Sequence, residues 1–124
     1  CRSLLEGFAY QLRLILEGLE QEQDIKAEVI QAGGGGAKSP LWCQIISDIT
    51  GMPVAVSDTV ENTSLGSAII TAQGLGLYED LKKATTAMGH KADKICHDQK
   101  NYQLYTEIYN CKYKKLYPVV RGKT

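Results

Sequence analysis

Residues 31–42 read QAGGGGAKSPLW and place four consecutive glycines directly before a lysine, a serine and a proline. A backbone without side chains lets a ligand come close to main-chain N–H groups, and the start of a helix favours negative charge. Lys38 could in addition reach a phosphate group. The stretch could therefore bind a phosphate or a nucleotide, or it could be a structural turn between two elements.

Two familiar phosphate-binding motifs do not fit this stretch. A Walker A loop that ends in Lys38 and Ser39 needs glycine at positions 32 and 37, and both positions hold alanine. The dinucleotide fingerprint G-x-G-x-x-G fails in both registers, because lysine or serine stands where its last glycine should be. The position of the stretch still favours a ligand site, because ligands of open α/β sheets bind where strands end and helices begin.

Hydrophobic spacing predicts the elements that position the turn. Residues 2–21 repeat large apolar side chains at helical spacing, and residues 28–32 form a short β-prone run that ends at the glycines. Ser39 and Pro40 are typical of the N-cap and first position of a helix, which Gly51 ends. The predicted buried side of this helix consists of Leu41, Trp42, Ile45, Ile46 and Ile49.

The second half of the chain continues the alternation. A short strand is predicted at 53–56, a helix after Asn62, a shorter helix at 78–88 and an extended stretch at 92–97. The helix after Asn62 has a face of small side chains, which consists of Leu65, Gly66, Ala68, Ile69 and Ala72. The order helix, strand, helix, strand, helix predicts an α/β fold with short parallel strands, right-handed crossovers and packed helices.

The last predicted helix, at about 99–117, carries tyrosines three or four residues apart, which places them on one face. They are Tyr102, Tyr105, Tyr109, Tyr113 and Tyr117. Such a face could stack on a ligand, but a structural packing face with the hydroxyls at its rim is the favoured interpretation.

Composition narrows the class of protein. The chain has 124 residues, 44% of them hydrophobic and 23% charged, which is typical of one globular domain or one piece of a larger one. Fourteen basic and fourteen acidic residues balance, so charge gives no reason to expect nucleic acid or an acidic membrane as a partner. Nothing resembles a signal peptide or a membrane span, and the absence of an initiator Met suggests a piece of a longer protein.

The four cysteines do not form a metal-binding or disulfide pattern. They are widely spaced, contain no C-x-x-C pair, and are Cys1, Cys43, Cys96 and Cys111. With only two histidines to join them, they do not resemble a zinc site. Reduced thiols in a cytoplasmic protein are the expected state.

Three stretches together resemble one family. GGGGAKSPLWCQIISDITGMPV, followed by ENTSLGSAIITAQGLGLY, is similar to the C-terminal part of the FGGY family of carbohydrate kinases. The opening CRSLLEGFAYQLRLILEGL resembles the family's helix R-A-x-x-E-G-x-A-[FY]-x-x-R, and the tyrosine-rich end that closes with LYP resembles its final helix. The resemblance runs over nearly the whole chain, so residues 1–124 are expected to be the nucleotide-contacting part of the family's C-terminal domain, without the N-terminal sugar domain.

The resemblance implies a fold and a function. The fold is an actin-like, ribonuclease-H-like ATPase of two domains with ATP in the cleft between them. The intact enzyme would use ATP and Mg²⁺ to phosphorylate a hydroxyl of a sugar, polyol or sugar acid. The nucleotide-binding positions carried over are Gly34, Gly35, Gly36 and Ser39, where Ser39 takes the adenine-side place that is often asparagine in the family.

The resemblance gives the neighbouring residues structural roles and no catalytic one. Lys38 is expected to be a solvated surface lysine, and Glu61 and the small residues after it to pack behind the turn. The family's aspartate base lies before the point that corresponds to Cys1, and neither Asp48 nor Asp58 matches it. No catalytic residue and no metal ligand are therefore assigned.

Two other functions stay open on the sequence. One is a stand-alone nucleotide-binding or regulatory module without turnover, from a truncated or split gene, and the other is a purely structural α/β piece. Two or three short strands would also leave a sheet edge and an apolar face uncovered, so the chain alone is expected to self-associate into a homo-oligomer.

Overall fold

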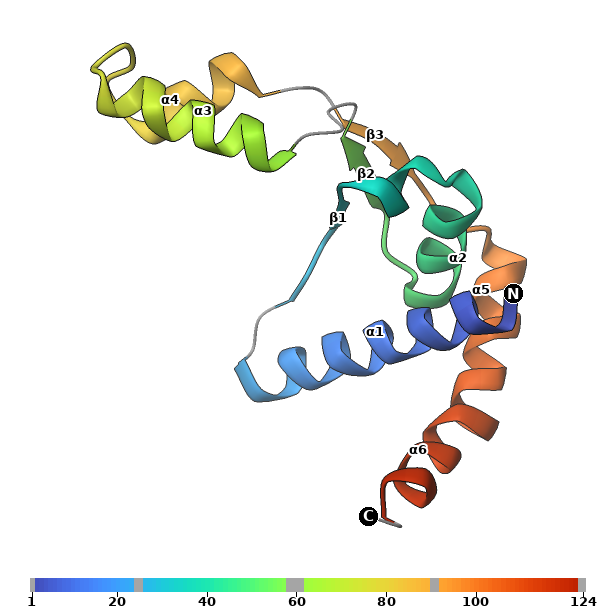
Figure 1. The fold of residues 1–124 in the computed structure, drawn as a ribbon. Coiled ribbons are helices and arrows are strands. Elements are labelled where there is room, and N and C mark those ends of the chain that lie inside the picture. The colour runs from blue at the N-terminus through green and yellow to red at the C-terminus, as the bar shows by residue number, and fades with distance from the viewer. Residues whose placement is uncertain (1, 24–25, 58–61, 90–91, 123–124) are drawn as a thin grey trace.

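The computed structural model describes residues 2–23, 26–57, 62–89 and 92–122 (Figure 1). The elements in chain order are α1 (Arg2–Gln23), β1 (Ile30–Ala32), the 3₁₀ turn η1 (Gly35–Lys38), α2 (Pro40–Thr50), β2 (Val54–Ser57), α3 (Asn62–Gly74), α4 (Leu81–Met88), β3 (Ala92–Ile95), α5 (Gln99–Ile108), the π-helical turn η2 (Tyr109–Tyr113) and α6 (Lys114–Arg121). None of the helices in this described part is long and apolar enough to cross a membrane.

The three strands form one small mixed sheet in the order β1-β2-β3. β1 pairs with β2 in parallel, with Ile30 opposite Val54, so the predicted parallel pair with α2 as its crossover is confirmed. β3 pairs with β2 antiparallel, with Ala92 opposite Ser57, so parallel pairing does not extend to the third strand. The reason is the connection: α3 and α4 pack as a helical hairpin that leaves from one end of β2 and returns the chain there (Figure 1).

The core lies where α1, α2, α5 and β2 meet. Its buried residues are Ala9, Tyr10, Cys43, Ile45, Ile46, Ile49, Val54, Tyr105 and Tyr109. The predicted buried side of α2 is confirmed for the three isoleucines, whereas Leu41, in the first turn of the helix, is 54% exposed. Gly51 ends α2 in the left-handed conformation, with φ of 74°, and a Cβ there would lie 2.6 Å from the Tyr102 ring.

The tyrosine face is a packing face, as the sequence predicts, and its partner is α1. Tyr105 and Tyr109 are buried, and the ring of Tyr10 in α1 lies edge-on to Tyr105 at 6.1 Å and stacks on Tyr109 at 5.8 Å between centroids. Tyr102 and Tyr113 are half-buried. The side chain of Tyr117 lies outside the described part of the structure.

Most of the buried hydroxyls of this face find a polar partner on α1. Tyr105 donates to Glu6 Oε1 at 2.7 Å and accepts a hydrogen bond from Arg2 at 3.0 Å. Arg2 and Glu6, four residues apart on α1, also pair with each other at 2.9 Å. The hydroxyl of Tyr10 is different, because it is buried and has no hydrogen-bond partner.

The predicted single helix at 99–117 is interrupted by the π-helical turn η2. In an α-helix, successive steps of four residues rotate the side chain by about 40° each, so tyrosines four apart drift off one face. A π-helical turn is wound more loosely and turns the later residues back. The interruption lets Tyr113 stay over α1, where its hydroxyl donates to Gln11 at 3.1 Å and its ring lies 5.1 Å from that of Tyr10.

Two residues of the small face of α3, Ile69 and Ala72, pack on α4, whereas Ala68 is exposed. This corrects the expectation that the face packs behind the glycine turn. Ile69 and Ala72 of α3 and Ala84 of α4 are buried, and the two helices project together from the sheet as an arm (Figure 1). Small residues allow this close approach. Glu61, which was expected to join them, lies outside the described residues.

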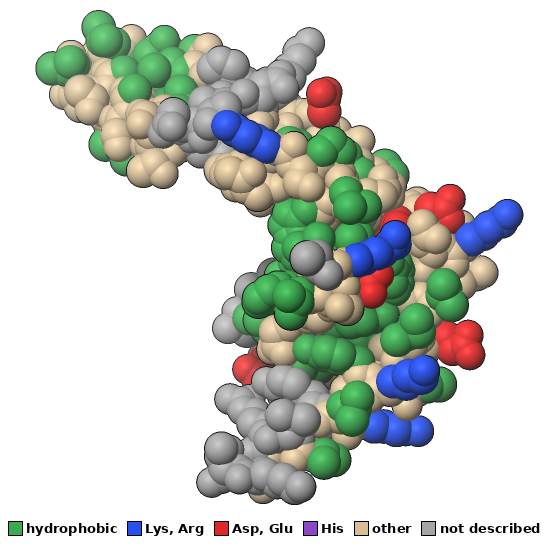
Figure 2. Space-filling model, turned by 45° about the vertical axis from the view of Figure 1, so that its right-hand side comes forward, with side chains coloured by type: hydrophobic (Ala, Val, Ile, Leu, Met, Phe, Trp, Pro, Cys, Tyr) green, Lys and Arg blue, Asp and Glu red, His purple; other side chains and the backbone are tan. Residues whose placement is uncertain are grey.

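Two surfaces carry most of the large apolar side chains that remain exposed. On the α3–α4 arm they are Ile70, Leu75, Leu77 and Leu81, and hydrophobic side chains gather at the end of the arm in Figure 2. On the outer side of α1 they are Leu4, Phe8, Ile15 and Leu19. Four of the apolar residues that predict α1 therefore lie outside the core, and they form an apolar stripe along that helix.

The contrast between Tyr10 and Tyr105 gives a prediction for stability. Tyr10→Phe removes a buried hydroxyl without a partner and should leave the free energy of unfolding at pH 7 unchanged or raise it by about 1 kcal/mol. Tyr105→Phe is the matched control and should lower it by about 1–2 kcal/mol, because Glu6 and Arg2 lose their shared partner. Urea unfolding of both variants tests this pair, and equal losses would contradict it.

Tyr10 also gives a prediction for how the free energy of unfolding depends on alkaline pH. Burial raises the pKa of Tyr10 to about 12. A phenol with a raised folded-state pKa contributes full stability below its unfolded pKa of about 10, and this contribution is lost as the pH rises from there toward 12. The loss of stability between these two pH values should therefore be smaller in Tyr10→Phe, as urea titrations at pH 9 and 11 would measure.

Candidate functional site

The glycine turn between β1 and α2 is built from its own backbone hydrogen bonds. Gly34 has φ of 77°, a left-handed conformation that favours glycine. Its carbonyl accepts the N–H of Ala37 at 3.2 Å, and the carbonyl of Gly36 accepts the N–H of Ser39 at 3.2 Å. The first glycine of the predicted site is therefore needed to make the turn.

Ser39 joins the turn to the helix and confirms the predicted N-cap. Its Oγ accepts the N–H of Trp42 at 3.3 Å, and its carbonyl accepts the N–H of Cys43 at 3.1 Å. Pro40 occupies the first helical position, where its missing N–H has no cost. The Ser39 hydroxyl proton stays available to donate to another acceptor, because capping uses only a lone pair of the oxygen.

The fold itself does not require glycine at position 35. Gly35 lies outside the left-handed region, and a Cβ placed on it would meet nothing within 4 Å. A Cβ on Gly36 would lie 3.6 Å from the Trp42 ring, which is ordinary van der Waals contact. The backbone conformation explains Gly34, but neither conformation nor internal packing explains Gly35, so the space beside Gly35 is open to something outside this part of the chain.

Side chains of α2 support the turn from within. The Cys43 thiol is fully buried and donates to the carbonyl of Ala37 at 3.7 Å. Burial raises the pKa of this thiol, so it stays protonated and keeps donating at neutral pH. The Trp42 ring lies against Gly36. The turn is thus fixed to the first turn of α2.

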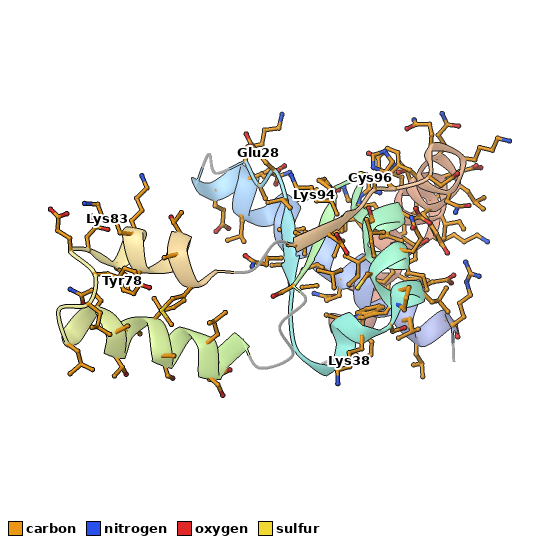
Figure 3. All side chains as sticks on the ribbon, turned by 90° about the horizontal axis from the view of Figure 1, so that it is seen from above. Glu28, Lys38, Tyr78, Lys83, Lys94 and Cys96 are labelled. Atoms are coloured by element: carbon orange, nitrogen blue, oxygen red, sulfur yellow. The ribbon has the colours of Figure 1, made fainter. Side chains whose placement is uncertain are left out.

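Lys38 is exposed at the end of the 3₁₀ turn, as expected for a surface lysine. Figure 3 places it at the outer edge of the turn, on the segment between β1 and α2. Its ammonium group is free to approach an anion or to remain in water.

The described carboxylates do not form a catalytic or metal centre at the turn. Asp48 is only 3% exposed and accepts three hydrogen bonds, from Gln44, the N–H of Asp98 and the side chain of Asn101. Its oxygens are therefore engaged in structural hydrogen bonds. Asp58 and Glu61 lie outside the described residues. Across residues 2–23, 26–57, 62–89 and 92–122, no group of three or more His, Cys, Asp or Glu could hold a metal ion.

A structural centre that the sequence did not predict is Arg13 of α1. Its Nη1 donates to the carbonyl of Ile49 and to Thr106 Oγ1, both at 2.9 Å, and its guanidinium lies 4.5 Å from the centre of the Tyr109 ring. It therefore ties α1 to the end of α2 and to α5. The signal that could have found it is the motif R-A-x-x-E-G-x-A-[FY]-x-x-R, whose last arginine is Arg13.

Arg13 is part of a charged cluster with Glu17. Burial raises the pKa of Glu17, but hydrogen bonds from Lys114, Tyr109 and Arg13 outweigh it and lower the pKa below its ordinary value. The carboxylate therefore stays ionised at neutral pH and holds α1 against the C-terminal helices. This cluster has a structural role, because its charged groups already bind one another.

Comparisons with known proteins place the turn in a family. Residues 1–75 match the FGGY family of carbohydrate kinases, C-terminal domain, and this range includes the whole glycine turn. The chain is 37% identical over 102 residues to an autoinducer-2 kinase of Photorhabdus laumondii, and the alignment covers 82% of this chain and 18% of that protein. It is 43% identical over 82 residues to an autoinducer-2 kinase of Yersinia enterocolitica, and this alignment covers 66% of this chain and 16% of that protein.

Solved structures agree on the fold. The xylulose kinase from Rhodospirillum rubrum superimposes with a TM-score of 0.78 at 24% identity, over 98% of this chain and 24% of that one. The Plasmodium falciparum glycerol kinase with ADP superimposes with a TM-score of 0.74 at 27% identity, over 92% of this chain and 23% of that one. The chain spans less than a fifth of the length of the two autoinducer-2 kinases. It belongs to the FGGY family of carbohydrate kinases and carries sequence of their C-terminal domain.

Proposed function

We propose that this chain is the nucleotide-contacting part of an ATP-dependent kinase that phosphorylates a hydroxyl of a sugar, polyol or sugar acid. The glycine turn would cover the nucleotide, with Gly34, Gly35 and Gly36 beside the phosphates or ribose and Ser39 toward the base. Residues 1–124 would form part of the C-terminal domain, and the sugar-binding domain would lie in the rest of the polypeptide.

The observation that carries this proposal is the open space beside Gly35. Glycine is not needed there by the backbone conformation or by any neighbouring atom, yet it lies in a strand–turn–helix segment of a kinase family. A ligand that packs against the backbone at Gly35 would explain why glycine stands at this position. The N-terminus of α2 follows directly, and the positive end of its helix dipole favours the negative charge of a phosphate.

The residues of this chain fit a nucleotide better than a metal. Main-chain N–H groups of the turn and the Ser39 hydroxyl can donate to phosphate, ribose or base, whereas the described carboxylates are not grouped for Mg²⁺. When bound, ATP would supply the phosphoryl group, and Mg²⁺ would be held by the phosphates and by carboxylates elsewhere in the polypeptide. This chain would position the nucleotide, and positioning is most of what a protein supplies in phosphoryl transfer.

The class of acceptor follows from the relatives. Their names are autoinducer-2 kinase, xylulose kinase, gluconate kinase and glycerol kinase. Small polyhydroxylated molecules are common to the last three, which supports a sugar, a polyol or a sugar acid as the acceptor. We also propose the cytoplasm as the compartment, because the described cysteines Cys43, Cys96 and Cys111 are free thiols.

Gly35→Val tests the nucleotide assignment in the intact kinase that contains this chain. The branched side chain would fill the space proposed for the ligand, so the KM for ATP should rise at least about tenfold while the KM for the sugar changes little. Gly18→Val is the matched control, since a Cβ there also meets nothing within 4 Å and the residue lies in α1. An unchanged KM for ATP in a folded Gly35→Val enzyme would refute the assignment.

The alternative is a stand-alone nucleotide-binding or regulatory module without turnover. The behaviour of the 124-residue chain alone distinguishes this alternative from the kinase proposal. We predict that the chain alone has no sugar kinase activity and binds ATP weakly, because closure of a cleft needs a second wall that would exclude water and hold the acceptor. The exposed apolar residues of α1 and the arm should also cause self-association.

The test combines three measurements on the purified chain. They are ADP release with pentoses, hexoses, gluconate and glycerol as acceptors, calorimetric titration with ATP, and light scattering for molecular size. Sugar-dependent ADP release would overturn the prediction. A monomer that binds ATP with micromolar affinity would support the stand-alone module instead.

A further inference from the structure

We propose that Asp48 is a positioning residue for the glycine turn, which it holds in place by docking the C-terminal segment 95–101 onto α2. The part of this inference that concerns nucleotide binding rests on the proposed function. Asp48 is the only charged residue among the buried side chains of the described part of the chain, and no role in binding or chemistry has been given to it above. It belongs to the SDITG stretch that follows the turn.

Three polar side chains on one face of α2 form what we call the polar seam: Gln44, Ser47 and Asp48. Each lies against the main chain at the end of β3 or directly after it. Gln44 donates to the carbonyl of Cys96 at 2.9 Å, Ser47 Oγ lies 3.2 Å from the carbonyl of Ile95, and Asp48 Oδ1 accepts the N–H of Asp98 at 2.8 Å. Figure 3 shows Cys96 at the end of β3.

Asp48 is the strongest member of the polar seam. Beyond the N–H of Asp98, it accepts hydrogen bonds from Asn101 Nδ2 and Gln44 Nε2, both at 2.9 Å. Asp98 caps α5, so the carboxylate of Asp48 also lies at the positive end of that helix. Hydrogen bonds to a buried carboxylate are stronger and more directional than neutral ones, and removing a partner leaves the charge poorly solvated.

The polar seam adds direction to the apolar packing of α2. The other side of the helix meets the core through isoleucines, whose non-directional contacts hold the helix in place but specify its rotation less sharply than hydrogen bonds do. Directional hydrogen bonds at the last turns of α2 set its rotation and axial position. The helix has 11 residues and is about 16 Å long, so a small tilt at Asp48 displaces the glycine turn at the other end.

The partners of the polar seam lie beyond the family match. Residues 1–75 match the FGGY C-terminal domain, whereas Ile95, Cys96, Asp98 and Asn101 follow it in the chain. The C-terminal segment therefore has a role in the nucleotide site without reaching it: it holds the helix that carries the turn.

The experiment uses Asp48→Asn in the intact kinase, because this change keeps the size and the Oδ1 acceptor. The new amide nitrogen would face the amide nitrogen of Asn101, so Asn101 must turn its amide over, and the charge-assisted hydrogen bond is replaced by a weaker neutral one. Hydrogen exchange at the amides of Ala37 and Ser39, which close the turn, should accelerate about tenfold, and the Kd for ADP should weaken by a similar factor. The double variant Asp48→Asn, Asn101→Asp restores one amide opposite one carboxylate and should bring both values back toward wild type.

A matched control and a milder variant keep the test decisive. Asp80→Asn changes another carboxylate that accepts a backbone N–H, at the start of α4, and should leave the turn amides and the Kd for ADP unchanged. Asn101→Ala removes a single donor and replaces Asp48→Asn if that variant does not fold; it should accelerate turn exchange as well.

The readouts separate the two proposals. If wild-type kinase does not bind ADP, the proposed function is wrong, but exchange at Ala37 and Ser39 still decides whether Asp48 positions the turn. If wild type binds ADP and folded Asp48→Asn shows wild-type exchange and wild-type Kd, the positioning role is overturned. Loss of stability without rescue by the double variant also contradicts it.

Discussion

The burial of α2 is the constraint on which the other features depend. Ile45 and Ile49 of this helix are almost fully buried where α1, α5 and β2 meet, and a chain of this size has few other places to bury apolar area. Because α2 follows the glycine turn directly, the contacts that bury the helix also fix the turn. The β1–β2 pair fixes the other side, since β1 ends where the turn begins.

Polar contacts give this apolar arrangement one geometry. Arg13 of α1 binds the carbonyl of Ile49 near the end of α2, the polar seam binds the segment at the end of β3, and tyrosine hydroxyls bind carboxylates of α1. Each contact joins parts of the chain far apart in sequence, so the C-terminal helices belong to the same unit as the turn. The α3–α4 arm does not share these contacts, which agrees with the exposure of its large apolar side chains.

Local features of the fold could be predicted from the sequence because local chemistry decides them. Ser39 and Pro40 begin α2 and Gly51 ends it, as capping preferences require, and the three isoleucines of α2 lie inside. Features that depend on tertiary contacts could not be predicted. The antiparallel direction of β3 depends on the α3–α4 hairpin, and the exposure of Phe8 depends on which side of α1 finds a partner.

The candidate site shows the same division. The glycines predict a close approach to the backbone, but only the structure separates Gly34, which the turn itself needs, from Gly35, which it does not. The motif R-A-x-x-E-G-x-A-[FY]-x-x-R singles out Arg13 but not its partners, and Asp48 is a single charged residue in a helix. The partners of both residues are distant along the chain. Their roles could not be inferred without the fold.

A crystal structure of the intact kinase with ADP would test the central claim most directly. The account predicts that a phosphate or ribose atom lies in van der Waals contact with Gly35 Cα, at about 4 Å, with α2 beginning beside it. It also predicts that Gly34 keeps its left-handed conformation. ADP bound elsewhere, with Gly35 facing solvent or packed against protein, would contradict the claim that this turn is the nucleotide site.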